Sequence, residues 1–328
     1  MRATARLERW PLAQPFGISR GVSTESFVLH VTIEHDGSRG YGEAEAAEFA
    51  LDDAERRVAE CQQYCNRLVS VDCDTARREL QTSLPAGPIR NALDCALWDL
   101  AAKLSGQRAW ELAGVARRTV HTLYTIALDT VETMRQSAHA HREWPWLKVK
   151  LGGGADDRDR LAAVHAAAPG AQLLVDANGG WSRAELERYA VDFAGFGVGV
   201  IEQPLPPGAD RSLADWNGPL PLCADESCTD RQSLAQLPRG YRMINIKLDK
   251  TGGLTEALQL ANAARAQGLG VMIGCNLGTS LAMAPALLIA TGADVVDLDG
   301  PLLLGADREP PLRYDVNLVN WPERALWG

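Results

Sequence analysis

Eight short apolar runs recur between residues 121 and 300, each ending in polar residues ahead of a segment with a helical pattern. They start 22 to 27 residues apart, which is room for one strand, one helix and two short loops. The runs are HTLYTIAL (121–128), WLKVKL (146–151), QLLVDAN (172–178), VGVIEQP (198–204), LPLCADES (220–227), MINIKLD (243–249), GVMIGC (270–275) and VVDLDG (295–300). This alternation predicts a parallel TIM-type (β/α) barrel, with a doubly wound open sheet as the alternative.

Two of the intervening segments show clear helix signals. The segment 156–170 opens with acidic residues, which suit the positive end of a helix dipole, and it stops at Pro169 and Gly170. The segment 254–268 ends in Gly268, a residue that can terminate a helix. One face of this second helix is predicted to consist of Leu254, Ala257, Leu258, Ala261 and Ala264.

The first 115 residues follow a different pattern. Residues 2–10 and 26–35 are predicted to form antiparallel strands, and Asp36-Gly37 supplies a turn. Helices are predicted over residues 51–67, 73–83 and 88–104. Strands followed by helices predict an α+β capping domain beside the barrel.

These patterns divide the chain into three parts. Residues 1–115 are predicted to form the capping domain and residues 116–304 the catalytic barrel. Residues 305–328 contain no further strand–helix unit, so we expect them to pack back against the capping domain and complete it.

Composition narrows the range of partners. The 328 residues carry a formal net charge of −9 without a Lys/Arg cluster, which argues against a nucleic-acid partner. A secretory signal is not expected, because no apolar run follows the arginines of the first ten residues. A membrane span is not expected either, because Pro285, Gly292 and Asp294 interrupt the most apolar stretch. Seven cysteines, an odd number without CxxC pairs, indicate reduced thiols in a cytosolic protein.

Charged residues stand at the predicted ends of six barrel strands. These carboxyl ends form the active face of such a barrel. A lone aspartate there is typically a helix N-cap and a lone lysine a solvated charge, but matching positions on six strands predict one shared site. The residues are Lys148, Lys150, Asp176, Glu202, Asp225, Lys247, Asp297 and Asp299.

Three of these carboxylates follow adjacent strands. Asp176, Glu202 and Asp225 would give an oxygen-only site, which favours Mg²⁺ over zinc. The six histidines do not occur at these strand ends, so a histidine base is not expected.

The lysines suggest the reaction. A proton beside a carboxylate is only weakly acidic, because its removal gives a doubly charged enediolate that a divalent cation can neutralise. A second ammonium and a metal make a lysine easier to deprotonate, and Lys148 beside Lys150 supplies that crowding. Lys247 would face the substrate from the opposite side, which predicts racemisation or epimerisation.

Several motifs resemble the enolase superfamily, in its muconate-lactonizing subgroup, over essentially the whole chain. They are RNALDCALWDLAAK (90–103), KVK (148–150), VDAN (175–178), IEQPL (201–205), ADES (224–227) and NIKLDKTGG (245–253). The resemblance implies that Asp176, Glu202 and Asp225 bind Mg²⁺. It also implies that Lys150 and Lys247 are the acid/base catalysts, with Lys148 assisting at the substrate carboxylate.

Within the subgroup, the motif DLDG (297–300) resembles that of dipeptide epimerases. There the two aspartates, here Asp297 and Asp299, would hold the N-terminal ammonium of the substrate. The stretches FGISRG (16–21) and YTIALDT (124–130) are similar to L-Ala-D/L-Glu epimerases. This likeness implies that Arg20 meets the side-chain carboxylate of the epimerised glutamate and that Thr125 lines the pocket.

We therefore expect a cytosolic epimerase of L-Ala-D/L-Glu or a similar dipeptide, in peptidoglycan recycling. The expected partner is the small dipeptide, with no nucleic acid or membrane, and a homo-oligomer is left open. Asn276, where relatives often carry Met, and residues 44–53 depart from the family pattern.

Related enzymes with the same core site are the alternatives. They are a muconate cycloisomerase, an o-succinylbenzoate synthase and a racemase of N-acylated amino acids. None of their substrates has an ammonium group for Asp297 and Asp299 to bind. A non-catalytic ligand-binding barrel is the remaining alternative, and it predicts gaps among the lysines and carboxylates that the sequence does not show.

Overall fold

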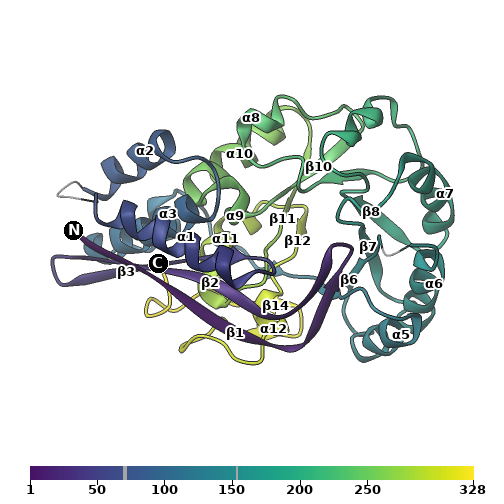
Figure 1. Cartoon of the computed structure of the whole chain (residues 1–328), viewed down its shortest axis with the longest axis horizontal. Coiled ribbons are helices and arrows are strands. Elements are labelled where there is room, and N and C mark those ends of the chain that lie inside the picture. The colour runs from purple at the N-terminus through teal and green to yellow at the C-terminus, as the bar shows by residue number, and fades with distance from the viewer. Residues whose placement is uncertain (69–71, 153) are drawn as a thin grey trace.

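The computed structural model describes residues 1–68, 72–152 and 154–328. Its N-terminal part is an antiparallel sheet of β1 (Arg2–Ile18), β2 (Gly21–His35) and β3 (Ser38–Ala47), in that order. Asp36 and Gly37 both have positive φ, 47° and 75°, as a tight two-residue hairpin turn requires. The helices beside this sheet lie at one end of the molecule, and the β1–β2 hairpin extends from there to the barrel (Figure 1).

The sheet is larger than the sequence pattern predicts. Strand β1 extends to Ile18, and its prolines are tolerated because it is an edge strand with an irregular register between Pro11 and Phe16. Strand β3 was not predicted, because it is rich in glycine and alanine, which are not typical strand residues. A Cβ on Gly40 would lie 2.2 Å from Ala96 O, so glycine there permits the close approach of a helix.

That helix is α3 (Pro88–Ser105), which follows α1 (Leu51–Cys65) and α2 (Cys73–Ser83). Most of α3 is buried, and some of its polar side chains bond to the barrel. Asp94 accepts hydrogen bonds from the backbone N (2.9 Å) and the hydroxyl (2.6 Å) of Thr255. Arg90 donates to Thr251 O at 2.7 Å. Helix α3 therefore fixes the N-terminal part against the barrel segment that contains Thr251 and Thr255.

Eight parallel strands form the barrel, in consecutive order. They are β5 (Tyr124–Ile126), β6 (Trp146–Lys150), β7 (Gln172–Asp176), β8 (Val198–Glu202), β9 (Leu222–Ala224), β10 (Tyr241–Ile246), β11 (Gly270–Ile273) and β12 (Val295–Val296). A hydrogen bond from Leu123 N to Val296 O (2.9 Å) joins the two ends of the curled sheet. The predicted barrel is thus confirmed, although the run 121–128 is split and its first part, β4 (Val120–His121), leaves the barrel sheet.

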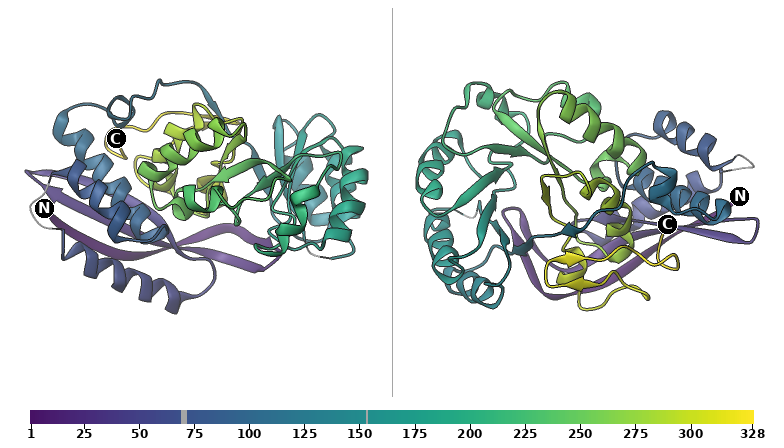
Figure 2. Two further views of the ribbon diagram at one scale, coloured as in Figure 1. Left: turned by 90° about the horizontal axis from the view of Figure 1, so that it is seen from above. Right: turned by 180° about the vertical axis from the view of Figure 1, so that it is seen from behind.

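Helices cover the outside of the barrel (Figure 2). The remaining helices, of which α4 precedes the barrel strands, are α4 (Ala109–Leu112), α5 (Val131–Ala140), α6 (Asp157–Ala167), α7 (Arg183–Ala194), the 3-10 helix η1 (Ala209–Asp215), α8 (Arg231–Leu234), α9 (Leu248–Thr251), α10 (Leu254–Ala266), α11 (Ser280–Ala290) and α12 (Gly300–Leu303). On α10 the buried face includes Leu260, whereas Leu258 is only half-buried. The barrel interior is filled by Leu123, Leu174, Val200, Cys223 and Met272.

The C-terminal segment touches both parts of the molecule. Its strands β13 (Tyr314–Asp315) and β14 (Leu318–Val319) form a small sheet with β4. Further on, the buried Trp327 donates to Cys95 O at 3.1 Å, and Gly328 N donates to Asp99 Oδ1 at 2.7 Å. The last residues therefore lie against α3.

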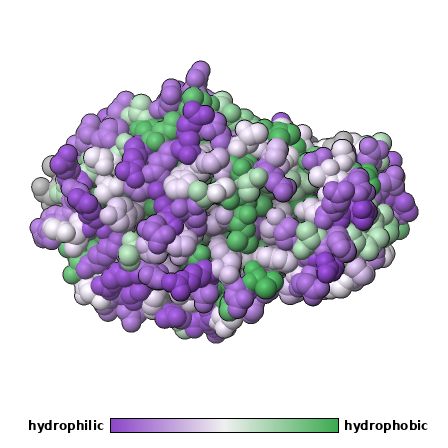
Figure 3. All heavy atoms as spheres, turned by 90° about the horizontal axis from the view of Figure 1, so that it is seen from below, coloured by the Kyte–Doolittle hydropathy of each residue, from purple (hydrophilic) through white to green (hydrophobic). Residues whose placement is uncertain are grey.

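The described residues include no membrane-spanning helix and no disulfide bond. Within residues 1–68, 72–152 and 154–328, no helix combines the length and the apolar character needed to cross a bilayer. One face of the surface shows mostly hydrophilic residues with small hydrophobic patches between them (Figure 3). All seven cysteines are free thiols.

Candidate active site

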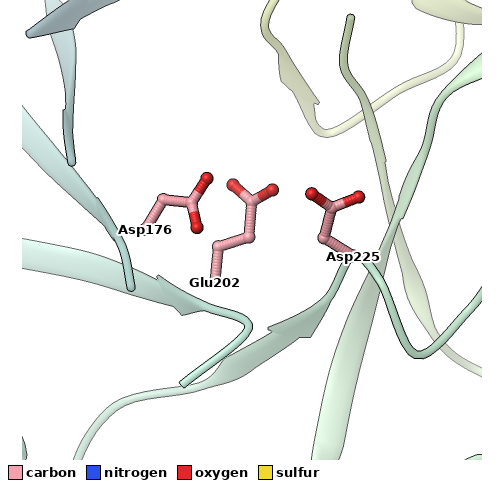
Figure 4. Close-up of side chains that lie close together, drawn as sticks. All are labelled: Asp176, Glu202 and Asp225. Carbon is pink, nitrogen blue, oxygen red and sulfur yellow. The ribbon is translucent and has the colours of Figure 1, made fainter. Parts of the chain in front are cut away.

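Three buried carboxylates converge at the carboxyl ends of adjacent strands (Figure 4). Asp176 and Glu202 are the last residues of β7 and β8 and are register partners, and Asp225 directly follows β9. Side-chain oxygens of the three residues lie within 4.8 Å of one another. These residues come together because parallel strands end at the same rim of the barrel.

The chemistry of this triad fits a divalent cation. Asn245 Nδ2 donates to Glu202 Oε1 at 2.7 Å, whereas Glu202 Oε2 and both Asp225 carboxylate oxygens lie against lysine ammonium groups, at 2.6–2.8 Å. Burial, with the charge of Asp176, raises the pKa of Glu202 to about 7. An oxygen-only set with such crowded negative charge is a suitable ligand set for Mg²⁺.

The ammonium groups of the lysines predicted from the sequence lie beside the triad. Lys148 Nζ lies 2.8 Å from Glu202 Oε2 and 3.1 Å from Asp176 Oδ2. Lys150 Nζ lies 2.6 Å from Asp176 Oδ2. Lys247, which follows β10, lies 2.8 Å from Asp225 Oδ2. Lys150 and Lys247 therefore flank the triad at its two ends, and both line the same cavity.

The carboxylates decide the protonation of these lysines. Burial lowers the pKa of Lys148, but Asp297, Glu202 and Asp176 outweigh it and hold that pKa well above the ordinary ammonium value. Burial also lowers the pKa of Lys247, and Asp225 reverses the effect. A neutral lysine at pH 7 therefore requires that a cation first neutralise the acids.

An open cavity lies between the barrel mouth and the N-terminal part. The β1–β2 hairpin forms part of its wall and is tied to the barrel, since Leu128 N donates to Gly17 O at 2.8 Å. Seven of the residues singled out from the sequence line this cavity: Arg20, Thr125, Lys148, Lys150, Lys247, Asp297 and Asp299.

Asp297 and Asp299 lie beside β5, on the other side of Lys148 from the triad. Thr125 N donates to Asp299 Oδ2 at 2.6 Å, and Thr125 Oγ1 donates to Asp297 Oδ1 at 3.4 Å. Burial, with the charge of Asp297, raises the pKa of Asp299 to about 7. Leu298, the residue between the two aspartates, is fixed by hydrogen bonds at both its backbone N–H and its backbone C=O. Leu298 N donates to Thr122 Oγ1 and Leu298 O accepts from the Tyr314 hydroxyl, each at 2.8 Å.

Arg20 lies on the turn between β1 and β2. Its guanidinium donates to Glu48 Oε1 at 2.9 Å and to Glu226 Oε1 at 2.8 Å. The structure thus places Arg20 in the cavity wall but with two carboxylates already bound to it.

Some residues of the site were not singled out from the sequence, although they belong to motifs noted there. Asn178 Oδ1 accepts from Lys150 Nζ at 3.2 Å, and Lys250 Nζ lies 2.6 Å from Asp225 Oδ1. Asn178 and Gln203 have positive φ, 43° and 33°, a strained conformation that is common at functional sites. The sequence signal that could have identified them is their position, because each is a polar residue that closely follows the end of a barrel strand.

The two stretches that depart from the family pattern meet in the cavity wall. Asn276 Nδ2 donates to Glu45 Oε2 at 2.9 Å, a contact between residues 231 positions apart in the chain. Glu45 lies on β3, within the uninterpreted stretch 44–53, which the structure divides between β3, a short connection and α1.

A carboxylate triad flanked by amines, at the mouth of a barrel beneath an α+β cap, defines a metal-dependent enzyme that moves a proton at carbon. Residues 1–114 match the mandelate racemase/muconate lactonizing enzyme N-terminal domain, and residues 129–302 match the enolase C-terminal domain-like family. The chain belongs to the enolase superfamily in this mandelate racemase/muconate lactonizing enzyme branch.

Two curated relatives are similar over nearly their full length. The L-Ala-D/L-Glu epimerase of Escherichia coli (strain K12) is 43% identical over 319 residues, with 94% of this chain and 95% of the relative covered. An N-acetyl-D-glutamate racemase of a Pseudoalteromonas species is 41% identical, with 88% and 91% covered.

Solved structures show the same likeness. An enolase family member from Agrobacterium tumefaciens, with homology to dipeptide epimerases and with bound sodium and L-Ala-L-Glu, is 42% identical and has a TM-score of 0.92 over 99% of both chains. A dipeptide epimerase from Methylococcus capsulatus, complexed with Mg and the dipeptide L-Arg-D-Lys, is 30% identical and has a TM-score of 0.89, with 99% and 98% covered.

Proposed function

We propose that this protein is a Mg²⁺-dependent dipeptide epimerase that interconverts L-Ala-L-Glu and L-Ala-D-Glu or a closely similar dipeptide. The observation that carries the proposal is the placement of Lys150 and Lys247 at opposite ends of the carboxylate triad and in one cavity. The 43% identity to an L-Ala-D/L-Glu epimerase and the 42% identity to a structure with bound L-Ala-L-Glu support the same substrate.

Asp176, Glu202 and Asp225 would hold the Mg²⁺ ion, which when bound supplies positive charge to the substrate carboxylate. Lys150 removes the α-proton on one face of the substrate and Lys247 delivers a proton on the other, with the roles reversed for the opposite stereoisomer. Lys148 sits between them and stabilises the negative charge that develops on the carboxylate.

The other end of the substrate would lie at Asp297 and Asp299. Two carboxylates that face a cavity recognise a cation, and the free amino end of a dipeptide is such a cation. Thr125 lines this end and orients both acids through its hydrogen bonds. Arg20 would meet the side-chain carboxylate of the epimerised glutamate.

Racemisation of an N-acylated glutamate is the second candidate, because an N-acetyl-D-glutamate racemase is 41% identical to this chain. Such a substrate shares the glutamate but has no ammonium group. The aspartate pair would then have no ammonium of the substrate to bind, and its charges would be offset only by Lys148, which favours the dipeptide.

The test is incubation in D₂O with Mg²⁺. A panel of L-Ala-L-Xaa dipeptides and N-acetyl-L-glutamate should be compared by the deuterium gained at the α-carbon, measured by mass. We expect exchange and epimerisation of L-Ala-L-Glu. Exchange of N-acetyl-L-glutamate alone would replace the dipeptide proposal with the second candidate, and no exchange in any compound would favour a ligand-binding barrel.

The division into a cap (residues 1–115), a barrel (116–304) and a returning segment (305–328) is part of the proposal. It is supported by the ion pair of Arg308 with Glu43, at 2.7 Å, and by the contacts of Trp327 and Gly328 with α3. We place the enzyme in the cytosol, in peptidoglycan recycling.

A further inference from the structure

The contact between Arg20 and Glu48 has the geometry of a ligand contact. Arg20 Nη2 donates to Glu48 Oε1 at 2.9 Å, and Arg20 Nε donates to Glu48 Oε2 at 3.4 Å. Two roughly parallel N–H···O bonds are the arrangement in which a guanidinium binds any carboxylate. Glu48 therefore occupies the edge of Arg20 on which a substrate carboxylate could be bound in the same way.

The other edge of Arg20 is anchored to the barrel. Its Nη1 donates to Glu226 Oε1 at 2.8 Å and to Asn178 O at 3.4 Å. Glu226 Oε1 also accepts from Asn178 Nδ2 at 3.3 Å, and the same Asn178 side chain accepts from Lys150. These connected contacts hold Arg20 in place and leave its Nε/Nη2 edge as the exchangeable one.

Glu48 is held much less firmly. Among the residues that the structure describes, its carboxylate accepts hydrogen bonds from Arg20 alone. It lies in the short connection between β3 and α1, where Ser23 Oγ holds only its backbone O, at 3.2 Å. Its side chain is 38% exposed and that of Arg20 is 42% exposed, so solvent and ligands reach both. The side chain can leave Arg20 without any change of the backbone.

A ligand in the cavity can reach the pair that Arg20 forms with Glu48. Arg20, Glu48 and Lys150 line the same cavity, so a ligand bound near the lysine is within reach of Arg20. Glu45 lines this cavity as well.

We propose that Glu48 is a built-in competitor that takes the place of the substrate's side-chain carboxylate on Arg20 and is displaced when an acidic dipeptide binds. The inference rests on the proposed function and adds a specificity-determining residue to it. When the substrate has an acidic side chain, its carboxylate can form the same hydrogen bonds with Arg20 that Glu48 loses on displacement. A neutral side chain cannot do so, because Glu48 stays on Arg20 and narrows the cavity. Exposed ion pairs are weak, so the competition should reduce affinity only about two- to five-fold.

The test is the variant Glu48→Gln, assayed with L-Ala-L-Glu and with its neutral isostere L-Ala-L-Gln. We expect KM for L-Ala-L-Glu to fall about two- to five-fold with kcat unchanged, and KM for L-Ala-L-Gln to stay the same. In an Arg20→Met background, Glu48→Gln should have no effect on either KM. A purely structural role of the ion pair predicts instead that KM rises for both dipeptides, and that result would overturn the inference.

Glu34→Gln is the matched control. Glu34 pairs with Arg39 at 2.6 Å and is also 38% exposed, but it does not line the cavity. Its kinetic constants should equal those of the unmodified protein, so that a change in Glu48→Gln reports on Arg20 rather than on the loss of a surface charge.

Failure of this inference can be told apart from failure of the proposed function. Calorimetry in a Lys150→Ala background measures binding of L-Ala-L-Glu without turnover, and Glu48→Gln should tighten that binding by the same factor. If the unmodified protein epimerises L-Ala-L-Glu while Glu48→Gln changes neither KM nor binding, the competitor role alone is wrong. If the protein neither binds nor epimerises L-Ala-L-Glu, both proposals are wrong.

Discussion

Lys148 Nζ and Asp297 Oδ2 form a buried ion pair at 2.8 Å that connects the two ends of the candidate site. The same ammonium group contacts Glu202 of the triad, also at 2.8 Å. Lys148 thus lies between the acids that would hold a metal and the acids that would hold an ammonium. A zwitterionic dipeptide has its carboxylate and ammonium at opposite ends, as this arrangement requires.

The first prediction concerns Asp297→Asn. The substitution removes a charge from the ammonium-binding end and leaves the triad intact, so kcat/KM for L-Ala-L-Glu should fall about ten-fold or more, the loss expected for a charge-assisted hydrogen bond. Mg²⁺ affinity, measured by calorimetry, should change much less. An equal loss of metal binding would show that Asp297 belongs to the metal site instead.

The second prediction separates the two lysines. Lys150→Ala and Lys247→Ala should each abolish epimerisation, because each removes one of two opposed proton carriers. Each variant should still exchange the α-proton of one stereoisomer with D₂O, and the two variants should spare opposite stereoisomers. Mass measurement on L-Ala-L-Glu and L-Ala-D-Glu checks this. Equal loss of exchange from both stereoisomers in one variant would contradict opposed bases.

The third prediction is stabilisation by metal. Mg²⁺ should raise the melting temperature, because a cation binds the crowded triad of the folded chain and not the unfolded chain. At about 100 times Kd the gain in unfolding free energy should be about 2.7 kcal/mol. Asp225→Asn should remove the shift. Asp215→Asn, at a side chain that is 82% exposed and outside the triad, should keep it.

The fourth prediction concerns pH and Glu45. Burial, with the charges of Asp249 and Glu48, raises the pKa of Glu45 to about 8 from an ordinary value of 4.5. A carboxyl whose pKa is raised by folding contributes its full stability below pH 4.5 and loses it as the pH rises towards 8. Glu45→Gln should therefore be more stable than the unmodified protein above neutral pH, by about 1–3 kcal/mol, and equal to it in acid.

Urea unfolding between about pH 5 and pH 9 would measure this difference. The amide at position 45 can still accept from Asn276, so the variant removes the charge and keeps the contact. Glu34→Gln serves as the control and should follow the unmodified protein at every pH. A difference between Glu45→Gln and the unmodified protein that does not vary with pH would contradict the assignment.

The sequence could predict much of the barrel and of the candidate site, because both depend on local order along the chain. The period of the apolar runs identifies each strand, and a residue at a strand end lies at the same rim as its counterparts on other strands. Asp176 and Glu202 come together for this reason alone, as register partners at the ends of β7 and β8. The third strand of the cap was missed because its glycines are explained only by the helix packed against them.

The sequence by itself determined the barrel, its cap and the set of acids and lysines, since strand periodicity and the direction of alternate side chains are local properties. Only the tertiary structure decided how the cap meets the barrel. The pairs Arg20–Glu226 and Glu45–Asn276 join residues 206 and 231 positions apart, and no local pattern relates them. Those contacts depend on how two separately formed parts pack, and they shape the cavity wall that would select the substrate.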